Sequence, residues 1–176
     1  MQFAFQHERP SAHRPVFCAA APLLLLMMAV NGCAGLILTG QVDALRITDV
    51  MNEGDATRRA SQRLLIEGLR ADAAGAGSAA KGKYERALQL DATNPYAYLV
   101  FARFELDRRN RDQAHAFLER AASLFDGEGS RSPRVEPHLL GMRGAIDGKG
   151  SSALEEARRM SPSVWGDGYL SAEELL

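Results

Sequence analysis

Cysteine is nearly absent from this chain. The 176 residues include two, Cys18 and Cys33, and both lie in the first fifth of the sequence. The part of the chain that follows therefore has no disulfide framework and no cysteine-based metal site. Aromatic residues are also few, at 7%. β-Branched residues are sparse in the middle of the chain, where alanine and leucine dominate, and this balance favours helices.

An excess of one charge sign is lacking as well. The 21 basic and 22 acidic residues give a formal net charge of −1, and each Arg-Arg pair is flanked by acidic or apolar residues. This pattern indicates solvated helix faces. It argues against nucleic acid as a partner, because such a partner needs clustered lysine and arginine.

Residue patterns typical of catalysis are not found either. After Cys33 the histidines are His115 and His138, and the sequence has neither a His-Glu-x-x-His pair nor a Gly-x-Ser-x-Gly elbow. Residues 77–83 match the glycine and lysine spacing of a phosphate-binding loop, but Tyr84 follows where serine or threonine must contact magnesium. We therefore predict that the protein is not an enzyme and that it holds no metal and no dissociable cofactor.

The N-terminal segment, as far as Cys33, carries the pattern of an export signal. Residues 1–15 include more basic than acidic side chains, and the apolar stretch 16–30 contains four consecutive leucines. This order is typical of a secretory signal peptide. The sequence Val30-Asn31-Gly32-Cys33 follows directly, and it resembles the lipobox of bacterial lipoproteins.

The lipobox resemblance implies a membrane anchor. Residues 1–32 would be removed as a signal peptide, Cys33 would carry a covalent lipid, and residues 33–54 would form the lipidated N-terminus and tether. Each buried methylene of such a lipid stabilises membrane binding by roughly 0.8 kcal/mol. In this family an aspartate after the cysteine favours the inner membrane, and Ala34 at that place favours the periplasmic face of the outer membrane. The alternative is that residues 16–38 remain as an inner-membrane anchor, because about 20 apolar residues can span a bilayer.

Residues 55–125 are predicted to form four helices separated by turns. Asp55 and Asn94-Pro95 are typical helix starts, and residues 75–78 are a typical break. The segment 84–90 aligns with the segment 118–124, so the sequence repeats itself at an offset of 34 (118 − 84). The small residues Gly68 and Ala80 have counterparts at the same offset, which are Ala102 and Ala114.

A helix–turn–helix period of about 34 residues resembles that of the tetratricopeptide repeat family. The resemblance implies an all-α fold, with a right-handed array of helical hairpins over residues 55–160. The array would contain two repeats and a degenerate third, and residues 161–176 would form a capping segment. Small residues such as Ala87 and Ala121 would let paired helices approach closely. One departure from the family is Glu105, which stands where an aromatic residue is usual.

In tetratricopeptide arrays the first helices of successive hairpins line a concave groove that binds a protein partner. The alignment predicts that eight side chains lie in this groove: Leu65, Leu69, Tyr96, Leu99, Arg103, Leu106, His138 and Met142. Apolar residues on such a face suit an amphipathic helix or an extended peptide. If they line a groove, replacing Leu99 and Arg103 will abolish binding without unfolding the domain. The alternative is that some of them belong to the core.

These features together predict a membrane-anchored scaffold or adaptor of the bacterial cell envelope. It would bind a protein partner through the groove and assist the assembly or stability of a larger complex. Because so short an array buries little surface, a permanent partner or self-association is expected to complete the stack. The alternative is an accessory subunit of a solute-transport system that holds a small ligand.

Overall fold

The computed structural model describes residues 40–176 except for 128, 130 and 149. Residues 39–176 form one compact unit. Its regular elements are helices, and no strand occurs among the described residues. The prediction of an all-α fold is thus confirmed. The predicted lipidation site, Cys33, and the apolar stretch 16–38 lie outside the described residues.

The first two long helices form a hairpin. Helix α2 (Ala56–Ala73) begins at the predicted cap, because the side chain of Asp55 accepts a hydrogen bond of 2.8 Å from the backbone amide of Arg58. Gly75 follows in the left-handed region with a φ of 76°, which only glycine adopts at little cost. The chain then returns along α2 as α3 (Gly77–Leu90).

The second hairpin repeats this arrangement. Helix α4 (Pro95–Asp107) is capped by Asn94, whose side chain accepts from the amide of Tyr96 at 3.1 Å, and proline is its first residue. Helix α5 (Arg111–Gly127) packs mainly against α4. Helices α3 and α5 begin at residues 77 and 111, and their difference (111 − 77) is the offset of 34 that the sequence repeats.

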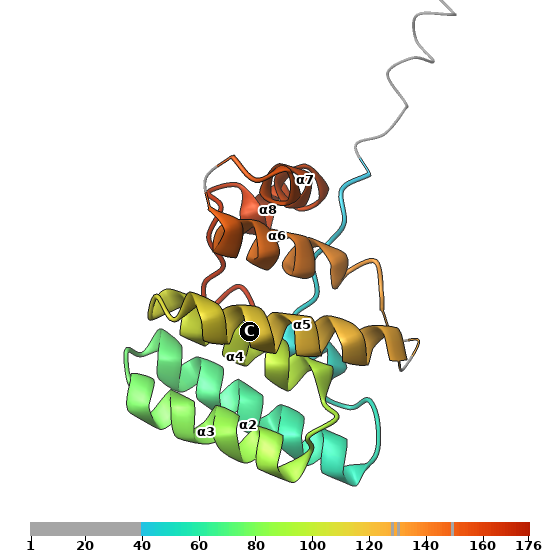
Figure 1. Ribbon diagram of the computed structural model, residues 1–176. Coiled ribbons are helices and arrows are strands. Elements are labelled where there is room, and N and C mark those ends of the chain that lie inside the picture. Colours follow the sequence, from blue (N-terminus) through green and yellow to red (C-terminus); the bar gives the residue numbers. More distant parts are fainter. Residues whose placement is uncertain (1–39, 128, 130, 149) are drawn as a thin grey trace, which may run out of the picture. The chain divides into compact units, whose positions relative to one another are not determined.

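A third, shorter pair lies beyond the second. Helices α6 (Glu136–Asp147) and α7 (Ser152–Met160) pack together, and the single-turn helix α8 (Pro162–Trp165) packs on α7. Figure 1 shows the pairs in layers, with α4 and α5 between the first pair and the third. The third pair lies where the sequence predicted a degenerate copy of the repeat.

Small residues let the paired helices approach closely, as the sequence predicted. Ala80, Ala87, Ala114 and Ala121 have no solvent-exposed surface. Gly68 of α2 is the tightest contact of the first pair, because a Cβ placed there would lie 2.7 Å from Cδ1 of Tyr84 and still closer to Cε1. The ring therefore occupies the space that any other residue at position 68 would need.

We predict that Gly68→Ala destabilises the protein. Overpacking a close helix contact costs about 1–3 kcal/mol. The ring of Tyr84 is fully buried and packs against the rings of Phe101 and Phe104. The matched control is Gly82→Ala on α3, where nothing lies within 4 Å of the added methyl group. That change should stabilise by about 0.5–1 kcal/mol, because alanine is the better helix former. Urea unfolding of both variants measures the difference, and equal stability would show that α2 and α3 pack less closely.

Both ends of the compact unit pack into its core. The N-terminal strap (residues 41–50) includes the 3-10 helix η2 (Ile47–Val50), and Leu45, Ile47 and Val50 are at most 4% exposed. The sequence had assigned residues 33–54 to a lipidated N-terminus and tether, and the strap within that range packs into the folded unit. The C-terminal tail (residues 166–176) buries Leu170 and Leu175 in the same core cluster.

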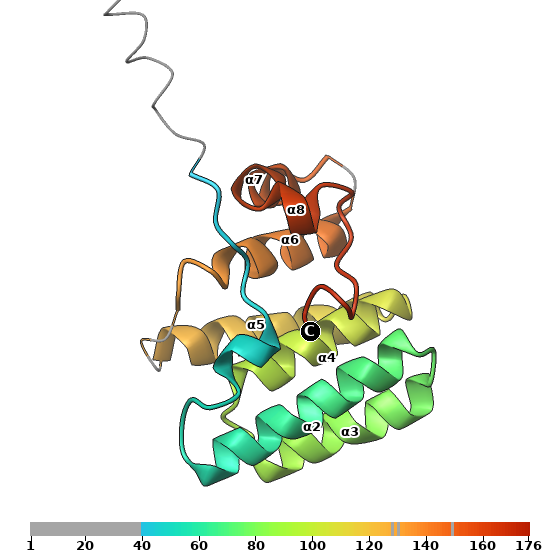
Figure 2. The ribbon, with the colours of Figure 1, turned by 180° about the vertical axis from the view of Figure 1, so that it is seen from behind.

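Main-chain hydrogen bonds hold the strap in place. The amide of Val42 donates to Met160 O (2.7 Å), that of Leu45 to Arg134 O (3.0 Å), and that of Ile47 to Leu175 O (2.8 Å). The strap therefore runs past the third pair of helices to the tail, and η2 packs against α2 (Figure 2). The tail was expected to cap the end of the array. It also forms a main-chain hydrogen bond with the strap, and both segments contribute to the core. Within the predicted capping segment 161–176, Trp165 is fully buried, whereas Tyr169 is half exposed.

Candidate binding cleft

The residues predicted to line a groove lie mostly inside the protein. Seven of the eight are at most 7% exposed, and Leu106 is half-buried. The strap and the tail contribute Ile47, Val50, Leu170 and Leu175 to the same core cluster. The prediction of an open groove on these side chains is therefore corrected. The chain's own ends occupy this face, since the apolar residues on both sides gain more by mutual burial than by contact with water.

Two polar members of that set have structural roles. Arg103 is 2% exposed and forms ion pairs with Asp72 and, at 2.6 Å, with Asp107. These pairs satisfy its buried charge and join α2 to α4. His138 is fully buried on α6, and its Nε2 lies 2.8 Å from the carbonyl oxygen of Leu45 in the strap. Neither side chain is presented to a partner.

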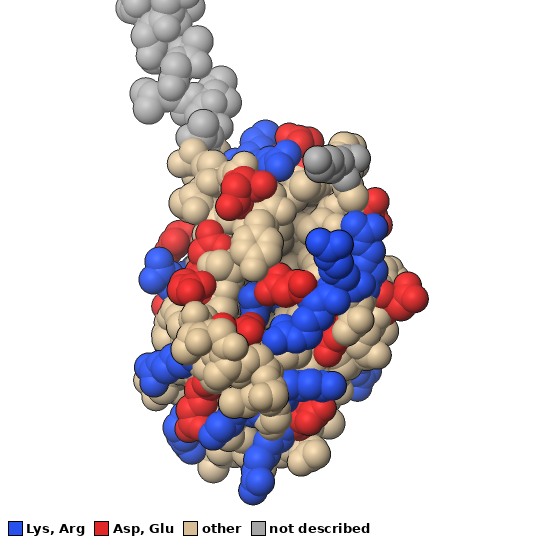
Figure 3. All heavy atoms as spheres, turned by 90° about the vertical axis from the view of Figure 1, so that its left-hand side faces the viewer, with Lys and Arg blue, Asp and Glu red and all other residues tan. Residues whose placement is uncertain are grey.

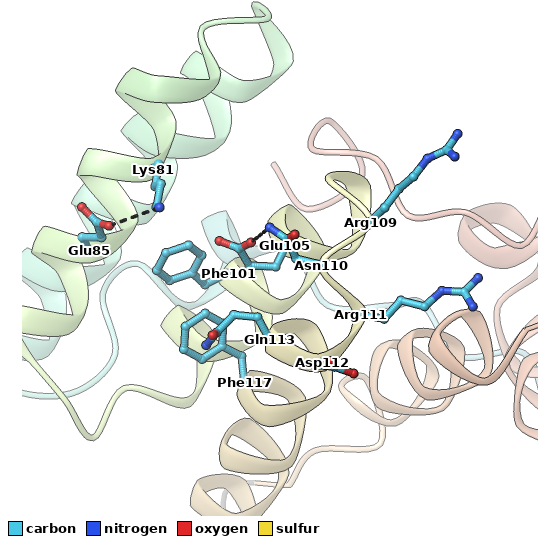
Figure 4. A pocket seen from close by; sticks show the side chains of 10 residues that line it. All are labelled: Lys81, Glu85, Phe101, Glu105, Arg109, Asn110, Arg111, Asp112, Gln113 and Phe117. Carbon is cyan, nitrogen blue, oxygen red and sulfur yellow. Dashed lines mark hydrogen bonds and ion pairs between the residues drawn. The ribbon is translucent and has the colours of Figure 1, made fainter.

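An open cleft of about 740 Å³ lies on a different face, between α3, α4 and the start of α5. This volume is within the range of about 300–1,000 Å³ that ligand-binding pockets occupy. The cleft is formed mainly by the second helices of the first two hairpins, and residues of the α4–α5 turn close one end (Figure 4). Its ten lining residues are Lys81, Glu85, Phe101, Glu105, Arg109, Asn110, Arg111, Asp112, Gln113 and Phe117.

The floor of the cleft is aromatic. The rings of Phe101 and Phe117 are stacked with centroids 4.7 Å apart and an interplanar angle of 25°. Phe101 also contacts the rings of Tyr84 and Phe104 at centroid distances of 5.8 Å. Burial raises the pKa of Tyr84, so this ring stays neutral. The packed rings make a rigid floor, because Phe101, Phe104 and Tyr84 are at most 4% exposed.

The α4–α5 turn orients an acidic side chain over this floor. Arg109 adopts a left-handed φ of 64°, and this bend brings Asn110 back toward Glu105. The backbone amide of Asn110 donates to the carbonyl oxygen of Glu105 at 2.9 Å. Its side-chain Nδ2 donates to Oε2 of the same residue at 2.6 Å. Glu105 is 6% exposed, yet it lines the cleft.

Charged side chains of both signs line the cleft, but they do not all face it. Figure 4 shows Lys81 and Glu85 on one wall and Glu105 and Gln113 extending toward the rings. In the same view Arg109 and Arg111 extend away from the floor. Lys81 and Glu85 form a loose ion pair, with Nζ and Oε1 3.8 Å apart and both side chains about half exposed (52% and 50%). Among the described residues Glu105 has no cationic partner, whereas Lys81 and Glu85 pair with each other.

Basic and acidic side chains are mixed on the outer face that includes the inter-helix turns (Figure 3). The net charge of the chain, −1, is likewise small. A long-range field of one sign is therefore weak, and recognition must depend on individual groups in contact with the ligand.

Sequence reasoning missed this cleft because both phenylalanines have the spacing of core residues. A signal was present in Glu105, a charged residue between the apolar residues of the segment 98–106. A polar side chain at a core position is unusual unless it has a specific partner or function. The partner here is Asn110, whose place was visible only once the turn was known.

Neither a protein-family model, nor a curated protein, nor a solved structure matches this chain. In the part of the chain that the structure describes, none of the helices combines the length and apolar character needed to cross a membrane. Among those same residues no group of three or more histidine, cysteine or acidic side chains is placed to hold a metal ion.

Proposed function

We propose that this protein is a lipid-anchored adaptor of the bacterial envelope that binds a protein partner through the cleft between α3, α4 and α5. The anchor is the lipid on Cys33, and the folded part is an array of the tetratricopeptide type. The open cleft is the observation that carries the proposal. It presents two aromatic rings among eight polar or charged side chains, which can orient a bound segment. The opposite set of helices is covered by the strap and the tail.

The helical array supports this proposal. The two main pairs, α2 with α3 and α4 with α5, follow each other along the chain, and their second helices begin at Gly77 and Arg111, which keeps the predicted offset. Repeated hairpins of this kind present extended surfaces to other proteins. The docking site proposed here differs from the groove predicted from the sequence, because the predicted groove residues are buried.

A site-specific crosslink in living cells tests the cleft. The photoreactive amino acid p-benzoylphenylalanine replaces Gln113 in the cleft, or Glu67, which is exposed on α2 outside it. We expect one discrete protein adduct from position 113 and none from position 67. Adducts of equal intensity from both positions, or from neither, would argue against a protein partner at the cleft.

We predict that Cys33→Ser prevents lipidation. Lipid transfer requires the cysteine thiol, so the substituted chain keeps residues 1–32 and carries no acyl chains. The intact mass of membrane-extracted, C-terminally tagged protein measures this. For the unsubstituted chain we expect the mass of residues 33–176 plus the lipid. Full-length, unlipidated mass in both proteins would instead assign residues 16–38 as a transmembrane anchor, and the adaptor would then belong to the inner membrane.

A further inference from the structure

The composition of the cleft points to the chemistry of its occupant. We propose that the cleft binds an arginine or lysine side chain from an extended segment of the partner protein. The cation would lie against the ring of Phe117, with the carboxylate of Glu105 beside it. This inference rests on the proposed function, since it names the class of partner segment for the same site.

The aromatic floor is the first argument for a cation. The face of an aromatic ring attracts a positive charge within about 6 Å of its centroid. Phe117 is half-buried and stacks on the buried Phe101 with one face. A cation in the cleft can therefore reach the part of its other face that Tyr98, at a centroid distance of 6.1 Å, leaves open. The protein already uses this contact elsewhere, because the guanidinium of Arg108 lies 3.3 Å from the centroid of Phe104.

The carboxylate is the second argument. Asn110 donates to Oε2 of Glu105, and this is the single hydrogen bond to the carboxylate within the described residues. The other oxygen, Oε1, retains its capacity to accept. A carboxylate held in a protein cleft is recognised best by a guanidinium or ammonium group, because charged hydrogen bonds are stronger than neutral ones. Its fixed position also lowers the entropy lost on binding.

The balance of charge in the cleft favours the same ligand. The cleft is lined by three acidic and three basic side chains, but Lys81 pairs with Glu85, and Arg109 and Arg111 extend away from the floor. Among the described residues no basic group pairs with Glu105. A bound cation would neutralise the unpaired carboxylate of Glu105, whereas a bound carboxylate would be repelled by it. Gln113 beside the rings can accept a hydrogen bond from either the cation or a peptide amide.

The size of the cleft indicates a peptide segment. A volume of about 740 Å³ exceeds what one basic side chain fills, so neighbouring residues of the segment have room along the walls. The cleft between α3, α4 and the start of α5 is open to solvent, so an extended chain can enter without local unfolding. A free amine would leave most of the volume to water.

Peptide titration of the full-length chain in detergent micelles tests the proposal. The probes are fluorescein-labelled glycine–serine hexapeptides with arginine, lysine, citrulline or glutamate at one central position. Citrulline has nearly the shape of arginine without its charge. We expect the arginine and lysine peptides to bind, with citrulline weaker by about tenfold or more, as lost charge-assisted hydrogen bonds predict. Equal binding of citrulline, or no binding of any peptide at millimolar concentration, overturns the proposal.

Variants of the cleft sharpen this test. Glu105→Gln retains the amide oxygen that accepts from Asn110 and removes the charge, so it should abolish the difference between arginine and citrulline. Phe117→Leu keeps an apolar floor without an aromatic face and should weaken the arginine peptide by a few-fold. The matched control, Glu67→Gln, removes an exposed carboxylate outside the cleft and should leave binding unchanged. Loss of discrimination in the control but not in Glu105→Gln overturns the assignment.

Lys81→Ala distinguishes cationic from anionic ligands. Removing this ammonium should strengthen the arginine peptide and should weaken any acidic one, because Lys81 lies across the floor from Glu105. Weaker arginine binding in this variant contradicts the proposal. Free arginine and spermidine form a further arm, and binding of either as tight as that of the peptide would assign the cleft to a small cationic solute.

The failure of this inference differs from that of the proposed function. If the crosslink from position 113 captures a discrete partner but Glu105→Gln leaves its yield unchanged, the adaptor function stands and the cation assignment fails. If position 113 gives no adduct, the proposed function itself fails.

Discussion

Leu99→Ala is expected to lower the free energy of unfolding by about 2–5 kcal/mol, since large-to-small changes in a packed core lose burial and leave a cavity. Leu99 has no exposed surface and belongs to the core cluster that includes the strap and the tail. The sequence had suggested that this residue faces a partner, in which case its replacement would leave the fold intact. Urea unfolding at neutral pH decides between the two interpretations.

The matched control for this experiment is Leu90→Ala at the end of α3. Leu90 is 44% exposed, so its truncation should change stability by no more than about 0.5 kcal/mol. If Leu99→Ala is as stable as this control and yet loses the crosslinked partner, the strap and tail must leave the concave face in solution. That outcome would restore the groove predicted from the sequence.

Acidification is expected to destabilise the protein through His138. Burial lowers the pKa of this imidazole to about 4, and the hydrogen bond with the Leu45 carbonyl offsets only part of that effect. Because the carbonyl oxygen only accepts, Nε2 carries the proton, and Nδ1 is buried without a partner among the described residues. A second proton on Nδ1 would therefore be a buried charge with no acceptor.

The direction of the pH effect follows from the two pKa values. The unfolded chain binds a proton near pH 6.5, whereas the folded chain does so near pH 4. The stabilisation is therefore complete above about pH 6.5 and is lost as the pH falls toward 4. A difference of 2.5 units (6.5 − 4) corresponds to about 3 kcal/mol.

Unfolding at pH 7.5 and at pH 4, for the unsubstituted chain and for His138→Gln, isolates this contribution. Glutamine can still donate to the Leu45 carbonyl but does not titrate, so the variant should lose about 3 kcal/mol less on acidification. Other titrating groups, such as Asp91, contribute equally to the pH dependence of both proteins, so their contributions cancel in the comparison. Burial alone would raise the pKa of Asp91, but hydrogen bonds from Arg58 and Thr93 lower it, and it contributes equally to both proteins. An identical pH dependence of the two proteins would mean that His138 is solvated or lies outside the core.

The titration of His138 is also linked to the docking of the strap. Its partner Leu45 lies 93 residues away along the chain, so the hydrogen bond exists only while the strap is docked. Acid should therefore release the strap before the helix pairs separate, and hydrogen exchange at the amides of Leu45 and Ile47 should increase first.

Local sequence determined much of the helical part. The side chains of Asp55 and Asn94 cap the first turns of α2 and α4. Such a cap depends only on residues within one helical turn, so the local sequence reveals it. The alanines of α3 and α5 are buried where the period predicted, because helical spacing alone places them on one face. These features depend on contacts between near neighbours in the chain, which a pattern can reveal.

Only the tertiary structure decided which faces remain open. The strap and the tail are far in sequence from the helices they cover, and nothing in their local pattern indicates that Ile47 and Leu175 meet inside the array. Their burial turned Leu65, Leu99, His138 and their neighbours from a predicted groove into core. The cleft arose in the same way, because Lys81 of α3 and Glu105, which Asn110 holds, line one cleft only after two hairpins have packed. A periodic pattern identifies the apolar face of a helix. Which segment covers that face depends on the apolar surface that every other segment of the chain can bury against it.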